Sequence, residues 1–194
     1  MMKILILPCF LLFIFSCNQP NKSNESTADT LKVVKKETEK PIDTPEKIVD
    51  DPIIDIRKKV EKINTTTLTT KHFELMCDEL MKVDYYYDND QIVKISVDFG
   101  TIGDVYAKED YYYDAGKLIF KYEFVEGGPA CDDCIKTNEY RSYIKQNKVI
   151  KYLKDKTETA CRLCEFTDYA KENRLLFAKS VDDIRTVMCK SQKK

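Results

Sequence analysis

KVDYYYDNDQIVKI at residues 82–95 and KEDYYYDAGKLIFK at residues 108–121 are two copies of one pattern, offset by 26 residues (108 minus 82). Each copy places a tyrosine triplet before a short polar turn and an apolar alternating run after it, which is typical of a β-hairpin. YRSYIKQNKVIKYL at residues 140–153 is a looser third copy. Three hairpins in series predict a six-stranded antiparallel meander.

The apolar side chains after the first two turns form two alternating rows, as expected for a half-buried sheet. The rows are Val93, Ile95, Val97 and Phe99, and Leu118, Phe120, Tyr122 and Phe124. When the turns are superposed, the second row falls one residue out of step with the first. A β-bulge, a different turn length or partial cover on both faces of the sheet would each explain this shift.

Helical patterns flank the hairpins. In DPIIDIRKKVEKIN at residues 51–64, Asp51 is suited to the N-cap and Pro52 to the first helical position. Near the C-terminus, Ser180 precedes an apolar helical stripe and predicts a capping box. The predicted fold class is α+β: a disulfide-stapled, six-stranded antiparallel meander with an N-terminal helix and C-terminal helices, in one globular domain of residues 51–194.

The first residues, MMKILILPCFLLFIFSCNQ, combine Lys3 with an apolar run at 4–15 that is shorter than the roughly 20 residues of a membrane span. This pattern predicts a signal peptide at residues 1–16. Residues 14–17, Ile-Phe-Ser-Cys, resemble a bacterial lipobox. The resemblance implies that Cys17 is the acylated first residue of a lipoprotein, anchored by its lipid in the bacterial cell envelope, at the outer membrane.

Residues 17–50 follow as a lipidated cysteine and a disordered tether, because the segment is polar and has no aromatic side chain. Loss of Lys3 with the signal leaves 31 basic residues (32 minus 1) against 33 acidic residues, a net charge of about −2. Such a balance excludes a nucleic-acid partner of the usual basic kind.

The helix and hairpins over residues 52–155 resemble a group of uncharacterised lipoproteins of Bacteroidota-type bacteria, built on repeated Tyr-Tyr-Asp-x-Gly-Lys-Leu hairpins. These motifs encode hairpin geometry rather than chemistry. The resemblance therefore implies a fold and a location but no activity.

Six cysteines remain after export and lipidation, and an oxidising envelope favours their pairing. They are Cys77, Cys131, Cys134, Cys161, Cys164 and Cys189. In a meander, alternate connections share one end of the sheet, so CDDC at 131–134 and CRLC at 161–164 are expected at the same end. We therefore expect disulfides that join CDDC to CRLC and Cys77 to Cys189, with no metal and no cofactor.

The same two motifs leave two alternatives open. Two CxxC pairs side by side can supply four thiolates to zinc. A redox role is a further alternative. Asp132 and Asp133 oppose it in CDDC because neighbouring carboxylates raise a thiol pKa, whereas Arg162 between the thiols of CRLC suits it better.

Catalytic signals are weak. The single histidine, His72, lies in a polar run that we expect to be a loop, and no nucleophile elbow, zinc-protease, phosphate-loop or dinucleotide motif occurs. No catalytic residue is assigned.

The aromatic set favours binding: the chain has twelve tyrosines and no tryptophan. Tyr86 and Tyr112, the middle members of the two triplets, are expected to point away from their neighbours and to be candidate binding residues for a glycan or a protein. The sequence thus predicts a lipid-anchored envelope protein with a non-catalytic binding or structural role. A zinc or thiol-redox protein, and an inhibitor of a foreign hydrolase, are the alternatives.

Overall fold

The structure is a computed structural model that describes residues 51–129, 131 and 133–189. The predicted signal peptide at 1–16, the predicted lipidation at Cys17 and the tether to residue 50 lie outside the described residues. Within the described part of the chain, no helix has both the length and the apolar character required to cross a membrane.

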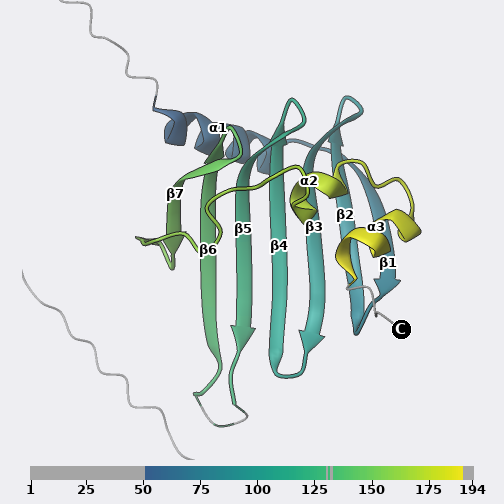
Figure 1. The fold of residues 1–194 in the computed structure, drawn as a ribbon, viewed down its shortest axis with the longest axis vertical. Coiled ribbons are helices and arrows are strands. Elements are labelled where there is room, and N and C mark those ends of the chain that lie inside the picture. The colour runs from purple at the N-terminus through teal and green to yellow at the C-terminus, as the bar shows by residue number, and fades with distance from the viewer. Residues whose placement is uncertain (1–50, 130, 132, 190–194) are drawn as a thin grey trace, which may run out of the picture. The chain divides into compact units, whose positions relative to one another are not determined.

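The central element is one antiparallel sheet of eight strands in which each strand pairs with its sequence neighbours (Figure 1). The strands are β1 (Thr69–Met76), β2 (Leu80–Asp88), β3 (Gln91–Ile102), β4 (Val105–Asp114), β5 (Lys117–Gly127), β6 (Lys136–Lys145), β7 (Lys148–Lys154) and β8 (Thr157–Glu158). The predicted α+β class and antiparallel meander are confirmed, but the predicted number of six strands is wrong.

The additional strands are β1 and β8, at the two ends of the strand order. β1 occupies the segment that we expected to be a loop, so His72 lies in a strand, paired with Asp84 of β2. As an edge strand β1 exposes most of its side chains, and Phe73 and Leu75 alone give its inward face. An edge strand of this kind lacks the apolar alternation on which the sequence prediction depended.

The predicted hairpin turns are present, and each has two central residues with positive φ. These are Asn89 and Asp90, Ala115 and Gly116, and Gln146 and Asn147. Two consecutive residues in this region define a type I′ turn, whose twist matches that of the flanking strands. All three turns therefore close tight hairpins at the same end of the sheet.

Each repeated hairpin also has a β-bulge one pair beyond its turn. The register shifts between Tyr86 and Tyr87, between Tyr112 and Tyr113, and between Tyr143 and Ile144. Because the bulges coincide, they do not explain the shift between the two apolar rows. Beyond the bulges, Ile95 and Val97 of β3 and Phe120 of β5 belong to opposite faces of the sheet. Leu118 lies on the turn side of its bulge and shares the face of Ile95, so the expected single row from Leu118 to Phe124 is wrong at Leu118.

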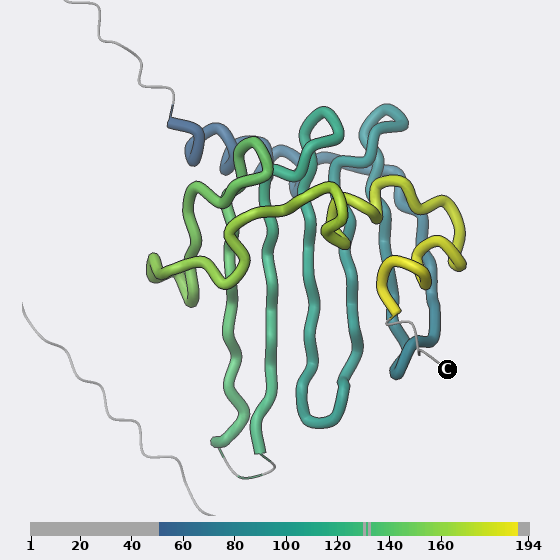
Figure 2. The backbone as a smooth tube through the Cα atoms, viewed as in Figure 1, coloured from purple at the N-terminus to yellow at the C-terminus, as the bar shows by residue number. Residues whose placement is uncertain are grey.

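The helices cover both faces. They are α1 (Pro52–Thr65), α2 (Lys171–Leu175) and α3 (Val181–Met188), with the predicted Asp51 N-cap and Ser180 capping box. Figures 1 and 2 show the chain after β7 crossing in front of the sheet with α2 and α3, and α1 behind it near the hairpin turns. We call these two sides the C-terminal face and the α1 face.

The core on the C-terminal face is the larger of the two. It contains Leu75, Met81, Val83, Tyr85, Ile95, Val97, Tyr111, Tyr113, Leu118, Ile144, Phe166, Leu175 and Ile184. The hydroxyls of Tyr85 and Tyr113 donate hydrogen bonds to the carbonyls of Leu175 (3.1 Å) and Glu172 (2.7 Å). The outer tyrosines of the triplets thus fasten α2 to the sheet.

The core on the α1 face is smaller and lies directly under α1. Ile56 of α1 packs with four side chains of the sheet, which are Tyr112, Phe120, Tyr143 and Leu153. Phe120 therefore faces α1, whereas Ile95 and Val97 of β3 face α2 and α3. Partial cover on both faces is thus the correct explanation of the shifted rows.

Three disulfides join the six cysteines: Cys77–Cys189, Cys131–Cys134 and Cys161–Cys164. The expected link between the CDDC and CRLC motifs is wrong, because each motif closes on itself. Cys77, in the β1–β2 connection, is joined to Cys189 at the end of α3, so this bond ties the last helix to the sheet.

The two CxxC motifs lie near opposite ends of β6. CDDC follows β5 where Gly127 pairs with Lys136, whereas the Cys164 carbonyl accepts a hydrogen bond from Val149, beside Ile144. From Lys136 to Ile144 the strand rises on the order of 26 Å at about 3.3 Å per residue. The reversal into β8, which the sequence analysis did not predict, sends the chain back toward the hairpin turns and separates the motifs.

Candidate functional site

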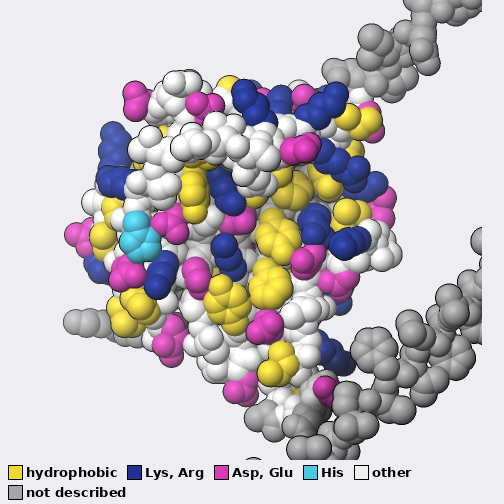
Figure 3. Space-filling model, turned by 180° about the vertical axis from the view of Figure 1, so that it is seen from behind, with side chains coloured by type: hydrophobic (Ala, Val, Ile, Leu, Met, Phe, Trp, Pro, Cys, Tyr) yellow, Lys and Arg dark blue, Asp and Glu magenta, His cyan; other side chains and the backbone are white. Residues whose placement is uncertain are grey.

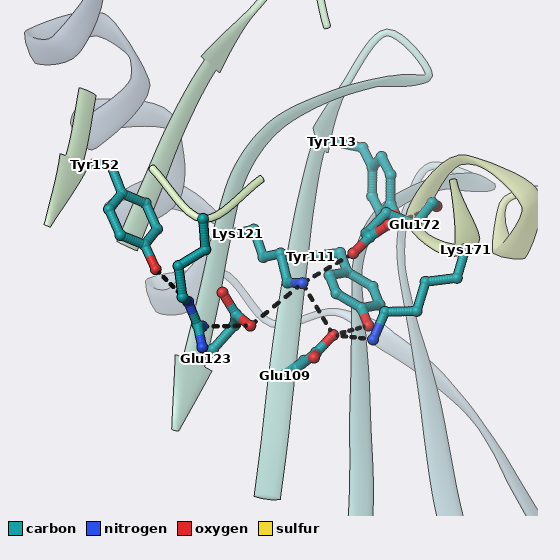
Figure 4. Close-up of polar contacts among 9 residues, drawn as sticks. Glu109, Tyr111, Tyr113, Lys121, Glu123, Tyr152, Lys171 and Glu172 are labelled. Carbon is teal, nitrogen blue, oxygen red and sulfur yellow. Dashed lines mark hydrogen bonds and ion pairs between the residues drawn. The ribbon is translucent and has the colours of Figure 1, made fainter. Parts of the chain in front are cut away.

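A buried network of charges lies between β4, β5 and α2 on the C-terminal face (Figure 4). Lys121 of β5, whose side chain is 7% exposed, is its centre. The Lys121 ammonium lies 2.9 Å from Glu172, 3.3 Å from Glu109 and 3.5 Å from Glu123. Burial lowers the pKa of Lys121, but these carboxylates outweigh burial and hold it above its ordinary value.

Lys171 and Tyr111 complete the environment of Glu109. Lys171 Nζ lies 2.7 Å from Glu109, and the Tyr111 hydroxyl donates a hydrogen bond to the same carboxylate. Burial alone would raise the pKa of Glu109, but Lys121 and Lys171 lower it below its ordinary value. Glu109 is therefore ionised at neutral pH and does not have the raised pKa of a general acid.

The CRLC loop contributes Arg162 to this network. Arg162 donates hydrogen bonds to the Tyr152 hydroxyl at 2.8 Å and to Glu123 at 3.2 Å, and its guanidinium lies 3.8 Å from the Tyr140 ring centroid. The network thus has three cations and three carboxylates, each with a partner of opposite charge. A set of charges that is balanced internally stabilises the packing of the tail on the sheet and leaves none of them for a ligand.

The α1 face offers a different arrangement. α1 covers only the part of this face near the turns, and Figure 3 shows hydrophobic side chains below the helix, interspersed with basic and acidic ones. Beside α1 the face is hollowed by a pocket of about 460 Å³, which falls in the usual range for small-ligand sites. Its lining residues are Arg57, Val60, Asn64, Asp110, Tyr112, Phe120, Tyr122, Arg141 and Tyr143. We call this pocket the α1 hollow.

Two arginines line the α1 hollow from opposite sides. Arg57 comes from α1, donates from Nε to the Tyr143 hydroxyl at 3.2 Å and lies over the Tyr143 ring. Arg141 comes from β6, donates from Nη2 to Glu139 at 2.5 Å and lies over the Tyr122 ring at 5.3 Å. Arg141 Nη1 is buried and has no hydrogen-bond partner among the described residues.

The acidic side of the hollow is already satisfied. Asp110 accepts a hydrogen bond from Ser96 at 2.5 Å and pairs with Lys94 at 3.2 Å. Burial lowers the pKa of Lys94, but Asp110 and Tyr112 outweigh that effect and raise it. Because Asp110 is fully partnered, the unused hydrogen-bonding capacity of the hollow is on its arginines.

Tyr122 lines the hollow, and Glu139 accepts hydrogen bonds from Tyr122 and Arg141. The Arg141 hydrogen bond lowers the pKa of Glu139, so this carboxylate is ionised. Desolvation, with the hydrogen bond from Tyr122 to Glu139, raises the pKa of Tyr122 to about 12. Tyr122 is thus a neutral aromatic side chain on the floor of the hollow.

The two candidate tyrosines lie on the expected side of the sheet. Tyr86 and Tyr112 pair with Lys94 from its two neighbouring strands, and the Lys94 ammonium lies 5.6 Å and 4.9 Å from their ring centroids. Tyr112 is on the floor of the hollow and donates to Asn64 at 3.0 Å, so it is buried rather than open for stacking. Tyr86 lies outside the hollow lining.

The cysteines form no common site. The separation of CDDC from CRLC prevents the shared four-thiolate zinc site that the sequence left open, since all four sulfur ligands must converge on one ion. His72 is exposed on β1 between Asp84 (2.6 Å) and Glu74 (3.4 Å), away from the hollow.

Sequence reasoning missed Arg57, Asn64 and Arg141. The charged side of α1, including Arg57, was expected to be only a solvated face. Arg57, Val60 and Asn64 nevertheless share the i, i+3, i+7 spacing that brings side chains to one helix face, next to the buried Ile56. That spacing was the available signal, whereas nothing in the sequence pairs α1 with Arg141.

Comparison of the chain with known protein families, with curated proteins and with solved structures finds no match.

Proposed function

We propose that this protein is a non-catalytic binding protein of the bacterial cell envelope, anchored by a lipid on Cys17, which holds its ligand in the α1 hollow. The partner is a glycan or a protein that presents a small group to the open face of the sheet. The apolar run and lipobox-like residues at 4–17 of the sequence support the location, and the α1 hollow supports the binding role.

One observation carries the binding role: Arg141 Nη1 is buried, without a hydrogen-bond partner among the described residues, in a pocket that Arg57 also lines. An unpaired buried donor costs about 1–3 kcal/mol. No described side chain accepts a hydrogen bond from Arg141 Nη1. A ligand atom that accepts it would therefore recover that free energy.

Binding is tested with defined glycans on an array and with envelope extracts. The purified protein is compared with Arg141→Gln and Tyr122→Ala variants. Arg185→Gln on α3 is the matched control, because Arg185 is exposed and pairs only with Asp182. We expect one ligand to be retained by the wild type and the control and lost by both hollow variants. A ligand bound equally by all four proteins would contradict the assignment of the hollow.

The anchor is tested separately by growing the expressing bacterium with an alkyne-tagged fatty acid. The wild-type chain is expected to incorporate the tag in the membrane fraction, and a Cys17→Ser variant is expected not to. Incorporation of the tag by the Cys17→Ser variant would refute Cys17 as the lipidated residue.

A thiol-redox role is the second candidate, and the observation that favours it is that each CxxC motif closes on itself. Titration in dithiol redox buffers, with mass spectrometry of alkylated cysteines, measures each midpoint potential. Structural disulfides typically lie below about −300 mV. A potential well above that value for Cys161–Cys164 would support the redox role, and values below it for both motifs would refute it.

A further inference from the structure

The hydrogen-bonding groups that remain free in the α1 hollow are donors. Arg57 donates a hydrogen bond from Nε to Tyr143, and Arg141 donates one from Nη2 to Glu139. Arg141 Nη1 has no partner in the part of the chain that the structure describes. The oxygens of Asp110, in contrast, are engaged by Ser96 and Lys94. A ligand that fits this arrangement must therefore present acceptors to the arginines.

The charge of the hollow indicates how many negative charges the ligand carries. Counting the charged lining residues and their direct ion partners gives three cations, Arg57, Arg141 and Lys94, and two carboxylates, Asp110 and Glu139. Three minus two leaves one positive charge. Arg57 is the cation without a carboxylate partner among the described residues. This favours an anion with a single charge over a doubly charged phosphate.

The location of the hollow on a sheet face also restricts the ligand. Between paired strands the backbone N–H and C=O groups are used in the ladder, and an extended peptide gains main-chain hydrogen bonds only at an edge. A ligand on this face is therefore held by side chains alone. The lining is mainly aromatic: Tyr112, Phe120 and Tyr143 are buried in the floor of the hollow, and Tyr122 is the partly exposed ring that a ligand can contact. Aromatic walls with a few oriented polar groups suit a compact ring.

We propose that the α1 hollow binds a sugar ring carrying one carboxylate, as in a uronic acid, with the carboxylate held between Arg57 and Arg141. The planar guanidinium matches the two oxygens of a carboxylate. The ring packs on Tyr122 and its neighbours. This inference rests on the proposed binding function and narrows its ligand.

The test uses three probes of similar size: a trimer of galacturonic acid, a neutral trimer of galactose, and a galactose trimer with a sulfate ester on each ring. Calorimetric titration is performed with the wild type, Arg57→Gln, Arg141→Gln and the control Arg185→Gln. We expect the galacturonate trimer to bind the wild type and the control at least about tenfold more tightly than the neutral trimer, and each hollow variant to lose that preference. Circular dichroism and thermal melting verify that the variants are folded.

Each alternative outcome overturns the inference in a recognisable way. Equal affinity for acidic and neutral trimers, with no effect of either arginine variant, would refute the carboxylate while leaving the hollow as a binding site. Tighter binding of the sulfated trimer would assign the anion to a sulfate ester. Failure of all three probes, together with an array ligand that still requires Arg141, would refute the acidic sugar but not the binding function. An array ligand indifferent to Arg141 would refute both.

Discussion

On the C-terminal face Lys121 lies within 3.5 Å of three carboxylates. On the α1 face, within the described part of the chain, Arg57 forms no ion pair and Arg141 has a buried nitrogen without a hydrogen-bond partner. On the first face α2, α3 and the chain that leads to them cross the part of the sheet nearer the hairpin turns, and α2 packs on the charge network. On the second face, which we call the open face, α1 alone covers the part near the turns. A charge that is removed from water must be compensated within the protein. The open face is therefore the place where unused donors persist and where a ligand is expected.

The largest expected effect comes from removing the disulfide that ties the end of α3 to the β1–β2 connection on the C-terminal face. Cys77→Ser with Cys189→Ser opens a loop with a sequence separation of 112 residues. In the chain-entropy model a loop of about 100 residues contributes about 4.7 kcal/mol, and a four-residue CxxC loop only about 2 kcal/mol. Chemical denaturation is expected to show this ranking between the double serine variant and a Cys161→Ser, Cys164→Ser control. Equal losses of unfolding free energy in the two double variants would contradict the ranking by loop length.

The second effect concerns the charge network. Lys121→Met leaves Glu172 and Glu109 without their shared cation, and we expect a loss of about 3–5 kcal/mol in the free energy of unfolding. The matched control is Lys82→Met, since Lys82 is 49% exposed and pairs only loosely with Glu74, at 3.7 Å. The control is expected to lose less than about 1 kcal/mol. A similar small loss for Lys121→Met would mean that the network is not important for stability.

A smaller effect is expected on the open face. Arg141→Gln removes one partly buried ion pair with Glu139, but it also removes the Nη1 that lacks a partner among the described residues. These two effects oppose each other, so the free energy of unfolding is expected to change by no more than about 1 kcal/mol. The same variant is expected to abolish ligand binding. Denaturation and calorimetry on one preparation measure both quantities. A large loss of stability would make Arg141 a structural residue and would remove the contrast between the two faces.

The smallest effect concerns His72, which is exposed on β1. Hydrogen bonds to Asp84 and Glu74 raise the pKa of His72 above its ordinary value of 6.5. The folded state therefore binds this proton more tightly, so the contribution to stability is complete below about pH 6.5 and is lost as the pH rises through the raised pKa. We expect His72→Gln to remove this component from a series of denaturation curves between pH 5 and about pH 8. An unchanged pH profile would show that the ion pair is screened by solvent.

The repeated hairpins were predictable because the information for a type I′ turn is local. Asn89 with Asp90 and Ala115 with Gly116 follow tyrosine triplets whose alternation sets which side chains share a face. The same alternation correctly assigned Tyr86 and Tyr112 to the face opposite their neighbours. Strand β1 was missed because an edge strand does not need a full apolar row.

The candidate site was only partly predictable. Tyr112 was selected from the triplet, but the sequence could not show that α1 would cover it, nor that Arg57 and Arg141 would meet beside it. These arginines are 84 residues apart (141 minus 57), and no periodic pattern connects them. The pairing within each CxxC motif depended likewise on the reversal at β8, which comprises only two residues.

The sequence by itself determined the hairpins, their turns, the helix caps and the α+β class, because each depends on residues within a few positions of one another. The tertiary structure alone decided which face each helix covers, which cysteines meet and where charges remain without partners. These features depend on how distant segments pack, and packing is set by the sum of many weak contacts rather than by any local pattern.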